Sequence, residues 1–96
     1  MSFEELYSVL NKRGFFNTFM VLSQYKEFKA EKGEFYRKLI EFSNYNSFLR
    51  IKDKLMETKL ITLEKNNGSE YIGLTEKGIS VYDSLLQLEK LIQEEN

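Results

Sequence analysis

The sequence predicts a mainly α-helical fold with one small β-hairpin (α+β), and two observations support this prediction. Apolar residues recur three or four positions apart along most of the chain, which is the spacing of amphipathic helices. The stretch LITLEKNNGSEYIGLTEKG, from Leu60 to Gly78, instead holds two β-favouring runs around an Asn-Asn-Gly-Ser turn. A two-stranded hairpin is only marginally stable alone in water. We therefore expect it to pack on the helices or to contact a partner.

Length and composition predict a single domain over residues 1–96. Of the 96 residues, 42% are hydrophobic and 30% are charged, as in ordinary globular proteins. No apolar run approaches the roughly 20 residues of a membrane span. The first residues, MSFEELYSVL, are acidic, whereas a secretory signal begins with basic residues. We therefore expect a cytoplasmic protein that has no membrane partner.

Cysteine and histidine are both absent from the sequence. Their absence excludes disulfides, thiol chemistry, histidine acid–base catalysis and zinc sites built on these residues. The sequence also lacks the glycine-rich motifs that bind nucleotide phosphates. We therefore predict no catalytic residue, no metal site and no cofactor, and we do not expect an enzyme.

The charges are unevenly distributed, although the net charge is only −1. Residues 1–33 carry five basic and four acidic side chains, and residues 34–65 carry seven basic and five acidic ones. Residues 66–96 carry two basic and six acidic side chains. Such a chain can present a basic face to a polyanion and keep its acidic end away from it. The alternative is that these charges only solvate the surface.

The N-terminal half is predicted to form two helices. Ser2 and Glu5 form a capping box for a helix near residues 3–12. Gly14 is expected to end or kink this helix, because glycine favours helix C-termini; one long bent helix is the alternative. The next segment, FFNTFMVLSQY, is apolar nearly all round, with Phe16 and Met20 beside its main apolar face, so we expect a buried central helix.

The middle of the chain predicts two further helices. The polar segment KEFKAEKGE is expected to be a loop that can include a short strand near 28–30. A helix over 34–42 and a second over 47–59 flank the turn SNYN at 43–46. Thr75 is expected to cap a final helix that runs towards Glu94. The phenylalanines at helical spacings are predicted to lie in the core, the alternative being a ligand pocket: Phe15, Phe16, Phe19, Phe35, Phe42 and Phe48.

The order helix, helix, turn, helix, hairpin, helix resembles the winged helix-turn-helix family over roughly residues 15–80. The segment IKDKLMETKLITLEKNNGSEYIGLTEKG carries most of the resemblance. Its LTEKG at 74–78 matches the family directly, whereas KLI replaces the usual GLI and puts Lys59 where glycine is common. The resemblance implies a core over 15–74 with a wing near 60–74, flanked by an N-terminal helix (1–14) and a C-terminal dimerisation helix (75–96).

The resemblance also implies that the helix near 46–57 enters the major groove of DNA while the wing contacts the backbone. On a helical wheel, Asn46, Arg50 and Asp53 lie opposite the core-facing residues. Asn and Arg suit base contacts, and Ser and Lys suit phosphates. Asp53 would repel phosphate unless it pairs with Arg50 or accepts from cytosine. The predicted DNA-binding residues are Asn46, Ser47, Arg50, Lys54, Lys65, Asn66, Asn67 and Ser69.

Four further residues have weaker predicted roles in this surface. Lys52 and Lys59 can add to the basic face. Tyr36 and Tyr45 are expected at the DNA face or beside a partner chain.

The C-terminal helix carries two apolar faces. Val81, Leu85, Leu88 and Ile92 recur at the spacing of a coiled-coil seam, and Ile79, Tyr82 and Leu86 form a second face. We expect one face to dock on the domain and the seam to form the dimer interface, because exposed apolar stripes usually mark interfaces. Packing of both faces on the N-terminal helix is the alternative. The resemblance to small archaeal regulators that dimerise through a terminal helix agrees with this expectation.

Taken together, the sequence predicts a homodimeric, sequence-specific regulator of transcription that binds double-stranded DNA. Two alternatives stay open: an architectural protein that binds DNA with little specificity, and a protein–protein interaction module that does not bind DNA. The composition, rich in Lys, Asn, Ile and Tyr and poor in Ala, predicts an archaeal or viral source.

Overall fold

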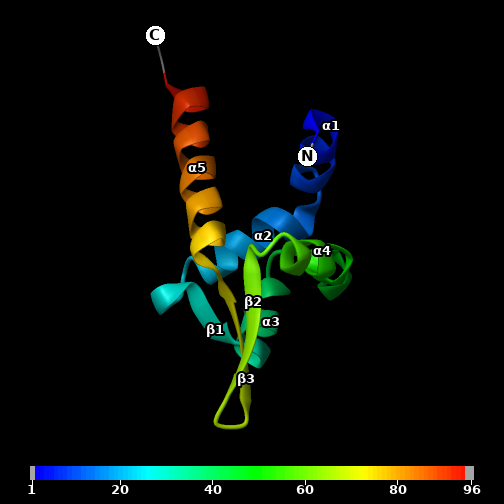
Figure 1. Cartoon of the computed structure of the whole chain (residues 1–96), viewed down its shortest axis with the longest axis vertical. Helices are drawn as coiled ribbons and strands as arrows, with labels where there is room; N and C mark the ends of the chain where they lie inside the picture. Colours follow the sequence, from blue (N-terminus) through cyan, green and yellow to red (C-terminus); the bar gives the residue numbers. More distant parts are fainter. Residues whose placement is uncertain (1, 95–96) are drawn as a thin grey trace.

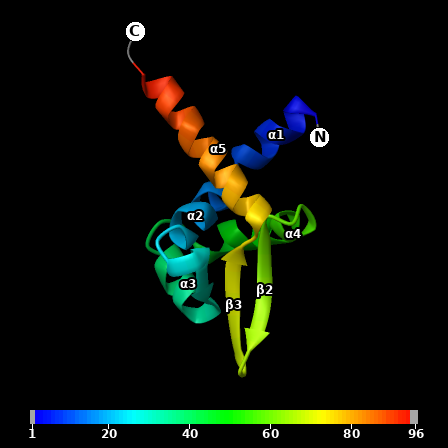
Figure 2. The same cartoon turned by 60° about the vertical axis from the view of Figure 1, so that its left-hand side comes forward.

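The computed structural model describes residues 2–94 and shows helices in the middle of the molecule with a hairpin at one end (Figure 1). The molecule measures 51 × 26 × 25 Å along its principal axes. Both α1 and α5 project away from the hairpin and diverge from each other (Figure 2). The elements in chain order are α1 (Phe3–Leu10), α2 (Arg13–Leu22), a 3₁₀ turn (Lys26–Phe28), β1 (Lys29–Glu31), α3 (Lys32–Leu39), α4 (Tyr45–Glu57), β2 (Ile61–Asn66), β3 (Ser69–Leu74) and α5 (Glu76–Gln93).

The predicted hairpin belongs to a three-stranded antiparallel sheet. Its strands have the order β1-β3-β2, so β1 pairs with β3 on the side away from β2. The short strand expected near 28–30 is therefore confirmed, and it lies at the edge of the sheet. Ile72 in the central strand is only 1% exposed and packs in the core. The sheet thus packs its inner face against the helices, which stabilises the hairpin.

The alternation of side chains along β2 and β3 gives the hairpin an inner and an outer face. Ile72 is buried, so Glu70, two residues earlier, lies on the same inner face, opposite its cross-strand partner Lys65. Glu64 lies on the outer face. A two-residue turn at Asn67 (φ 52°) and Gly68 (φ 83°) closes the hairpin, as the Asn-Asn-Gly-Ser segment predicted. The inner face of the hairpin therefore presents charged residues next to the helices.

The core is built from aromatic and aliphatic side chains of α2, α3, α4 and the sheet. Phe15, Phe19, Phe35 and Phe48 are buried as predicted.

Two other phenylalanines correct the prediction: Phe16 is 46% exposed and Phe42 is 44% exposed. Phe16 lies on the side of α2 that lines an open groove beside α5, and Met20, 37% exposed, lies there with it. The helix predicted over 34–42 ends at Leu39, so helical spacing no longer controls Phe42.

Gly14 has a different role from the one predicted. The chain breaks between α1 and α2 at Lys12, which has extended φ and ψ, so Gly14 lies in the first turn of α2. There are thus two separate helices instead of one bent helix. A Cβ at Gly14 would lie 2.3 Å from the carbonyl oxygen of Ser47. Gly14 therefore allows α2 to pack closely against the first turn of α4.

The C-terminus of α4 turns sharply into β2. The amide of Leu60 donates to the Leu55 carbonyl at 2.9 Å, and that of Lys59 donates to the Met56 carbonyl at 3.0 Å. This is the Schellman arrangement, in which the first residue beyond the cap has a left-handed conformation. Lys59 occupies that position with φ 61°. The left-handed φ explains why glycine is usual at this position of the GLI motif.

The LTEKG segment anchors α5 on this same turn. Thr75 caps α5, as predicted, by accepting a hydrogen bond from the Gly78 amide at 3.0 Å. Lys77 Nζ donates to the Thr58 carbonyl at 2.7 Å. A Cβ at Gly78 would lie 2.1 Å from the Leu60 carbonyl oxygen, so only glycine permits this approach. The two halves of the sequence motif therefore contact each other and fix the start of α5 to the end of α4.

The first half of α5 docks on the core, and the second half extends beyond it. The half-buried residues of the docked part come from both predicted faces: Ile79, Val81, Tyr82 and Leu85. The exposed apolar residues all follow them: Leu86, Leu88, Leu91 and Ile92. Docked and exposed apolar residues thus differ in their position along the helix axis, and not in the face of the helix on which they lie. Among residues 2–94, no helix combines the length and the apolar character that crossing a bilayer requires.

Candidate nucleic-acid interface

The orientation of α4 is fixed by its cap and by its buried stripe. Asn44 caps the helix, with its Oδ1 accepting from the Asn46 amide at 2.8 Å. Phe48, Ile51 and Leu55 are buried, as their spacing predicted. The opposite face is exposed and carries Asn46 and Arg50, the two residues predicted to contact bases. This face can therefore reach a partner without rearrangement of the helix.

An apolar residue lies on the same exposed face. Leu49 is 42% exposed and immediately precedes Arg50. On the helical wheel it lies on the flank of this face away from Ser47 and Lys54, and no role for it was predicted. An exposed aliphatic side chain beside Asn and Arg can contact the 5-methyl group of thymine in the major groove.

The two flanks of α4 carry different basic residues. Lys52 lies on the flank towards the hairpin, close enough to the Glu70 carboxylate to lower its pKa. Lys54 lines a groove between α1 and α5 instead. Ser47 is half-buried, and its carbonyl faces Gly14 of α2. The structure therefore separates the predicted phosphate contacts Ser47 and Lys54 from the hairpin and brings Lys52 towards it.

The predicted contacts on the hairpin lie near its tip. Lys65, Asn66 and Asn67 are exposed, and Ser69 is half-buried. Lys65 belongs to the inner face, whereas Asn66 pairs with Ser69 at the last position before the turn. Arg50 and Lys65 thus belong to two different elements, α4 and β2.

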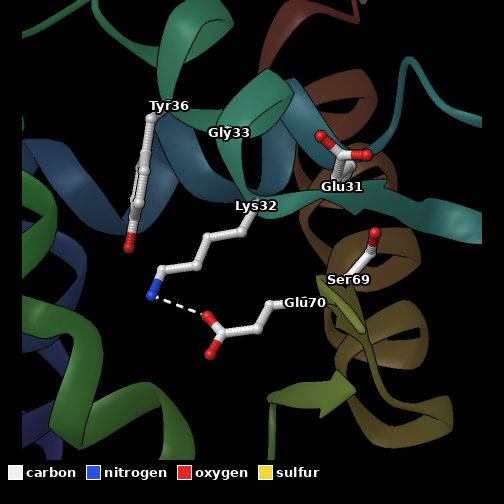
Figure 3. Close-up of a pocket in the computed structure, with 6 residues that line it drawn as sticks. All are labelled: Glu31, Lys32, Gly33, Tyr36, Ser69 and Glu70. Carbon is white, nitrogen blue, oxygen red and sulfur yellow. Dashed lines mark hydrogen bonds and ion pairs between the residues drawn. The ribbon is translucent and has the colours of Figure 1, made fainter. Parts of the chain in front are cut away.

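A crevice with a volume of about 390 Å³ lies between the N-terminus of α3 and β3. It is lined by Glu31, Lys32, Gly33, Tyr36, Ser69 and Glu70, as Figure 3 shows.

Within the crevice, the Lys32 ammonium donates to Glu70 Oε2 at 2.8 Å and lies 5.9 Å from the centre of the Tyr36 ring (Figure 3). The hydrogen bond and the charge of Lys32 lower the pKa of the Glu70 carboxyl, with smaller contributions from Lys65 and Lys52. Lys32 therefore contacts the Glu70 carboxylate directly, whereas Lys65 and Lys52 act on it through their charge.

Two tyrosines connect this crevice to the start of α4. The rings of Tyr36 and Tyr45 meet edge to face, with centroids 4.9 Å apart. Burial and the neighbouring Tyr45 hydroxyl raise the pKa of Tyr36 to about 12, so its hydroxyl keeps its proton at neutral pH. Tyr36 also packs against Phe48. These contacts hold the middle of α3 beside the first turn of α4.

Sequence reasoning did not identify Lys32 and Glu70 as functional residues. They are 38 positions apart, and no local pattern joins them. The structure brings them together because β1 pairs with β3 and α3, which begins at Lys32, follows β1 directly.

The predicted dimer residues differ in exposure. Val81 and Leu85 are half-buried on the core, whereas Leu88 is 49% and Ile92 is 74% exposed. Two apolar grooves of about 480 and 470 Å³ run along α5, and Leu88 lines both of them. Leu6, Val9 and Leu10 of α1 line the first groove on its other side. Apolar surface therefore surrounds the second half of α5.

Comparison of this chain with models of known protein families gives no match, and comparison with curated protein sequences gives none either. Among solved structures, the chain is similar to F93 from STIV, a winged-helix DNA-binding protein, with a TM-score of 0.68 and 19% sequence identity. The similarity covers 82% of this chain and 89% of that protein. It includes the helices, the hairpin and the C-terminal helix. The chain therefore has the winged-helix fold that its motifs predicted, with the β2–β3 hairpin as the wing.

Proposed function

We propose that this protein is a sequence-specific transcriptional regulator that binds double-stranded DNA in the cytoplasm as a homodimer. The observation that carries the proposal is the exposed face of α4, which bears Asn46 and Arg50 in a chain with the winged-helix fold. In DNA-binding helix-turn-helix proteins, a helix in this position enters the major groove. The similar STIV protein, described as DNA-binding, supports the same assignment.

Each part of the surface has a separate proposed role. Asn46 and Arg50 contact base edges, and Leu49 contacts thymine methyl groups. Ser47 and Lys54, on one flank of α4, contact the backbone of one strand. The hairpin contacts the other strand through Lys65, Asn66, Asn67 and Ser69. The role is one of binding, and the proposal requires no catalytic step.

The proposed dimer forms along the exposed half of α5. Leu88 and Ile92 are 49% and 74% exposed; Leu88 lines both apolar grooves, and Ile92 lines the second. Burial of a large aliphatic side chain contributes about 1.5–3 kcal/mol. Two copies of this surface can therefore associate, with Val81 and Leu85 completing the seam at its docked end. A two-fold dimer presents two copies of α4 to two halves of a palindromic site.

Selection of bound sequences from random duplex DNA at moderate salt tests the function. Enrichment of a palindrome is the expected result. Retention of DNA without enrichment would favour an architectural protein, and absence of retention at low salt would favour a protein–protein interaction module. Binding should weaken steeply as salt rises, because each neutralised phosphate releases counterions.

Two substitutions test the assignment of residues. Arg50→Ala should relax the choice of sequence, because it removes a base contact, whereas Lys65→Ala should weaken binding evenly across sequences. Unchanged affinity in both variants would place the DNA-binding surface elsewhere on the molecule.

A further inference from the structure

The inner face of the hairpin carries the carboxylate of Glu70, and a negative charge on a DNA-binding surface repels the phosphates of DNA. Glu70 pairs with Lys32 of α3 at 2.8 Å and lies across from Lys65 of β2, and the charges of Lys65 and of Lys52 in α4 further lower the pKa of its carboxyl. We name this group of three lysines the lysine cluster. The cluster includes residues of α4 and of the hairpin, which form the proposed DNA surface, and one residue of α3.

The contact between Glu70 and Lys32 is direct and exposed. Their side chains pair at 2.8 Å, and the side chains are 52% and 36% exposed respectively. Exposed ion pairs contribute little to stability, because water and salt screen them. The pair can therefore open at small cost when another anion takes its place.

The chemistry of the lysine cluster fits an oxyanion. Figure 3 shows the Lys32 ammonium extending from the start of α3 towards the Glu70 carboxylate. The adjoining cavity of about 390 Å³ gives space for a phosphate group and its neighbouring sugar. Glu31 also lines this cavity, so the three lysines against Glu70 and Glu31 leave one positive charge in excess. A phosphodiester carries a single negative charge, as the carboxylate does.

We propose that Glu70 occupies, in the free protein, the position that a backbone phosphate of duplex DNA takes in the complex. The phosphate displaces the carboxylate from Lys32 and binds the lysine cluster. The inference rests on the proposed function and deepens it, because it assigns a phosphate site and a residue that limits binding to it. The displaced carboxylate stays on β3 near the phosphate and repels it. Glu70 thereby lowers affinity for all DNA, so that base contacts by α4 decide which sequences are bound.

The outer face of the hairpin provides a matched control. Glu64 lies on the neighbouring strand, also pairs with a lysine (Lys29, at 3.0 Å) and is similarly exposed. Its side chain is directed away from the lysine cluster. Glu64→Gln therefore changes the net charge as Glu70→Gln does but leaves the proposed phosphate site intact.

The experiment measures binding of a duplex of unrelated sequence by fluorescence anisotropy over a range of salt concentrations. Glu70→Gln should raise affinity about tenfold at moderate salt, which corresponds to about 1.4 kcal/mol. The logarithm of the binding constant should also fall more steeply with the logarithm of salt, by about 0.9, because no carboxylate then remains beside the bound phosphate to offset one positive charge of the cluster. Glu64→Gln should change neither quantity by more than a small fraction of these values.

A double-mutant cycle tests the exchange of partners itself. Lys32→Gln should reduce affinity more in the Glu70→Gln background than in the wild-type protein, because only in that background does Lys32 lack an internal partner. Circular dichroism and thermal unfolding verify that all variants are folded.

Three outcomes would overturn the inference. Equal effects of Glu70→Gln and Glu64→Gln would show a general charge effect, and additive effects of the Lys32 and Glu70 substitutions would show that the two residues act independently. Both outcomes leave the proposed function standing. Failure of the wild-type protein and of every variant to bind DNA at low salt would overturn the proposed function, and the phosphate site with it.

Discussion

Lys59→Gly is expected to stabilise the protein. Lys59 has φ 61° in the turn that joins α4 to β2, and a left-handed conformation costs an L-residue with a side chain roughly 1–2 kcal/mol. Glycine adopts it without that cost, although it loses roughly 0.5–1 kcal/mol more conformational entropy on folding. The difference is a gain of about 0.5–1 kcal/mol in the free energy of unfolding.

Thermal unfolding followed by circular dichroism can measure this gain. In a domain of this size, 1 kcal/mol shifts Tm by about 4–8 °C, so the expected rise is roughly 2–8 °C. Urea unfolding should give a higher midpoint with an unchanged slope, because the surface exposed on unfolding stays the same.

Lys59→Ala is the matched control for the left-handed conformation. Alanine removes the charge and the long side chain but keeps a Cβ, so this variant should be no more stable than wild type. Stabilisation by alanine equal to that by glycine would show that the lysine side chain, and not φ, carries the cost. A lower Tm for the glycine variant would refute the reasoning altogether.

Three further predictions concern packing, base contacts and association. Gly14→Ala should lower the free energy of unfolding by about 1–3 kcal/mol, because its Cβ meets the Ser47 carbonyl of α4; Asn11→Ala, outside that contact, is the control in chemical denaturation. Replacement of contacted thymines by deoxyuridine should weaken binding by the wild-type protein about fourfold per methyl group, or about 0.8 kcal/mol. The Leu49→Ala variant should bind thymine and deoxyuridine duplexes equally well. An equal loss in the wild-type protein and in this variant would exclude the contact. Leu88→Asp with Ile92→Asp should give monomers in light scattering, whereas a persistent dimer would place the interface elsewhere.

Features set by neighbouring residues could be predicted from the sequence. The turn at Asn67 and Gly68 and the cap at Thr75 each need only a few adjacent side chains, and the structure has both. The buried stripe of α4 also follows from spacing alone. These local signals were enough to predict the order of elements, and the resemblance of that order and of the LTEKG segment to a known family predicted the winged-helix fold.

Features that depend on distant contacts could not be predicted in the same way. Gly14 was expected to end or kink a helix, but its role comes from the Ser47 carbonyl of another helix. Phe16 continues an apolar pattern, but the core contacts the other side of α2, so Phe16 remains exposed. The pairing of Lys32 with Glu70 requires β1 to align with β3, which no local spacing encodes.

The anchoring of α5 on the end of α4 has a geometric consequence for a two-fold complex. Since Thr75, Lys77 and Gly78 all contact the turn after α4, the base of α5 and α4 are expected to move together as one rigid unit. The angle at which two α5 helices cross would then set the separation of the two α4 helices. A residue inserted between Leu85 and Leu88 would rotate the outer turns by about 100° and would thereby change the spacing between the half-sites of the preferred operator.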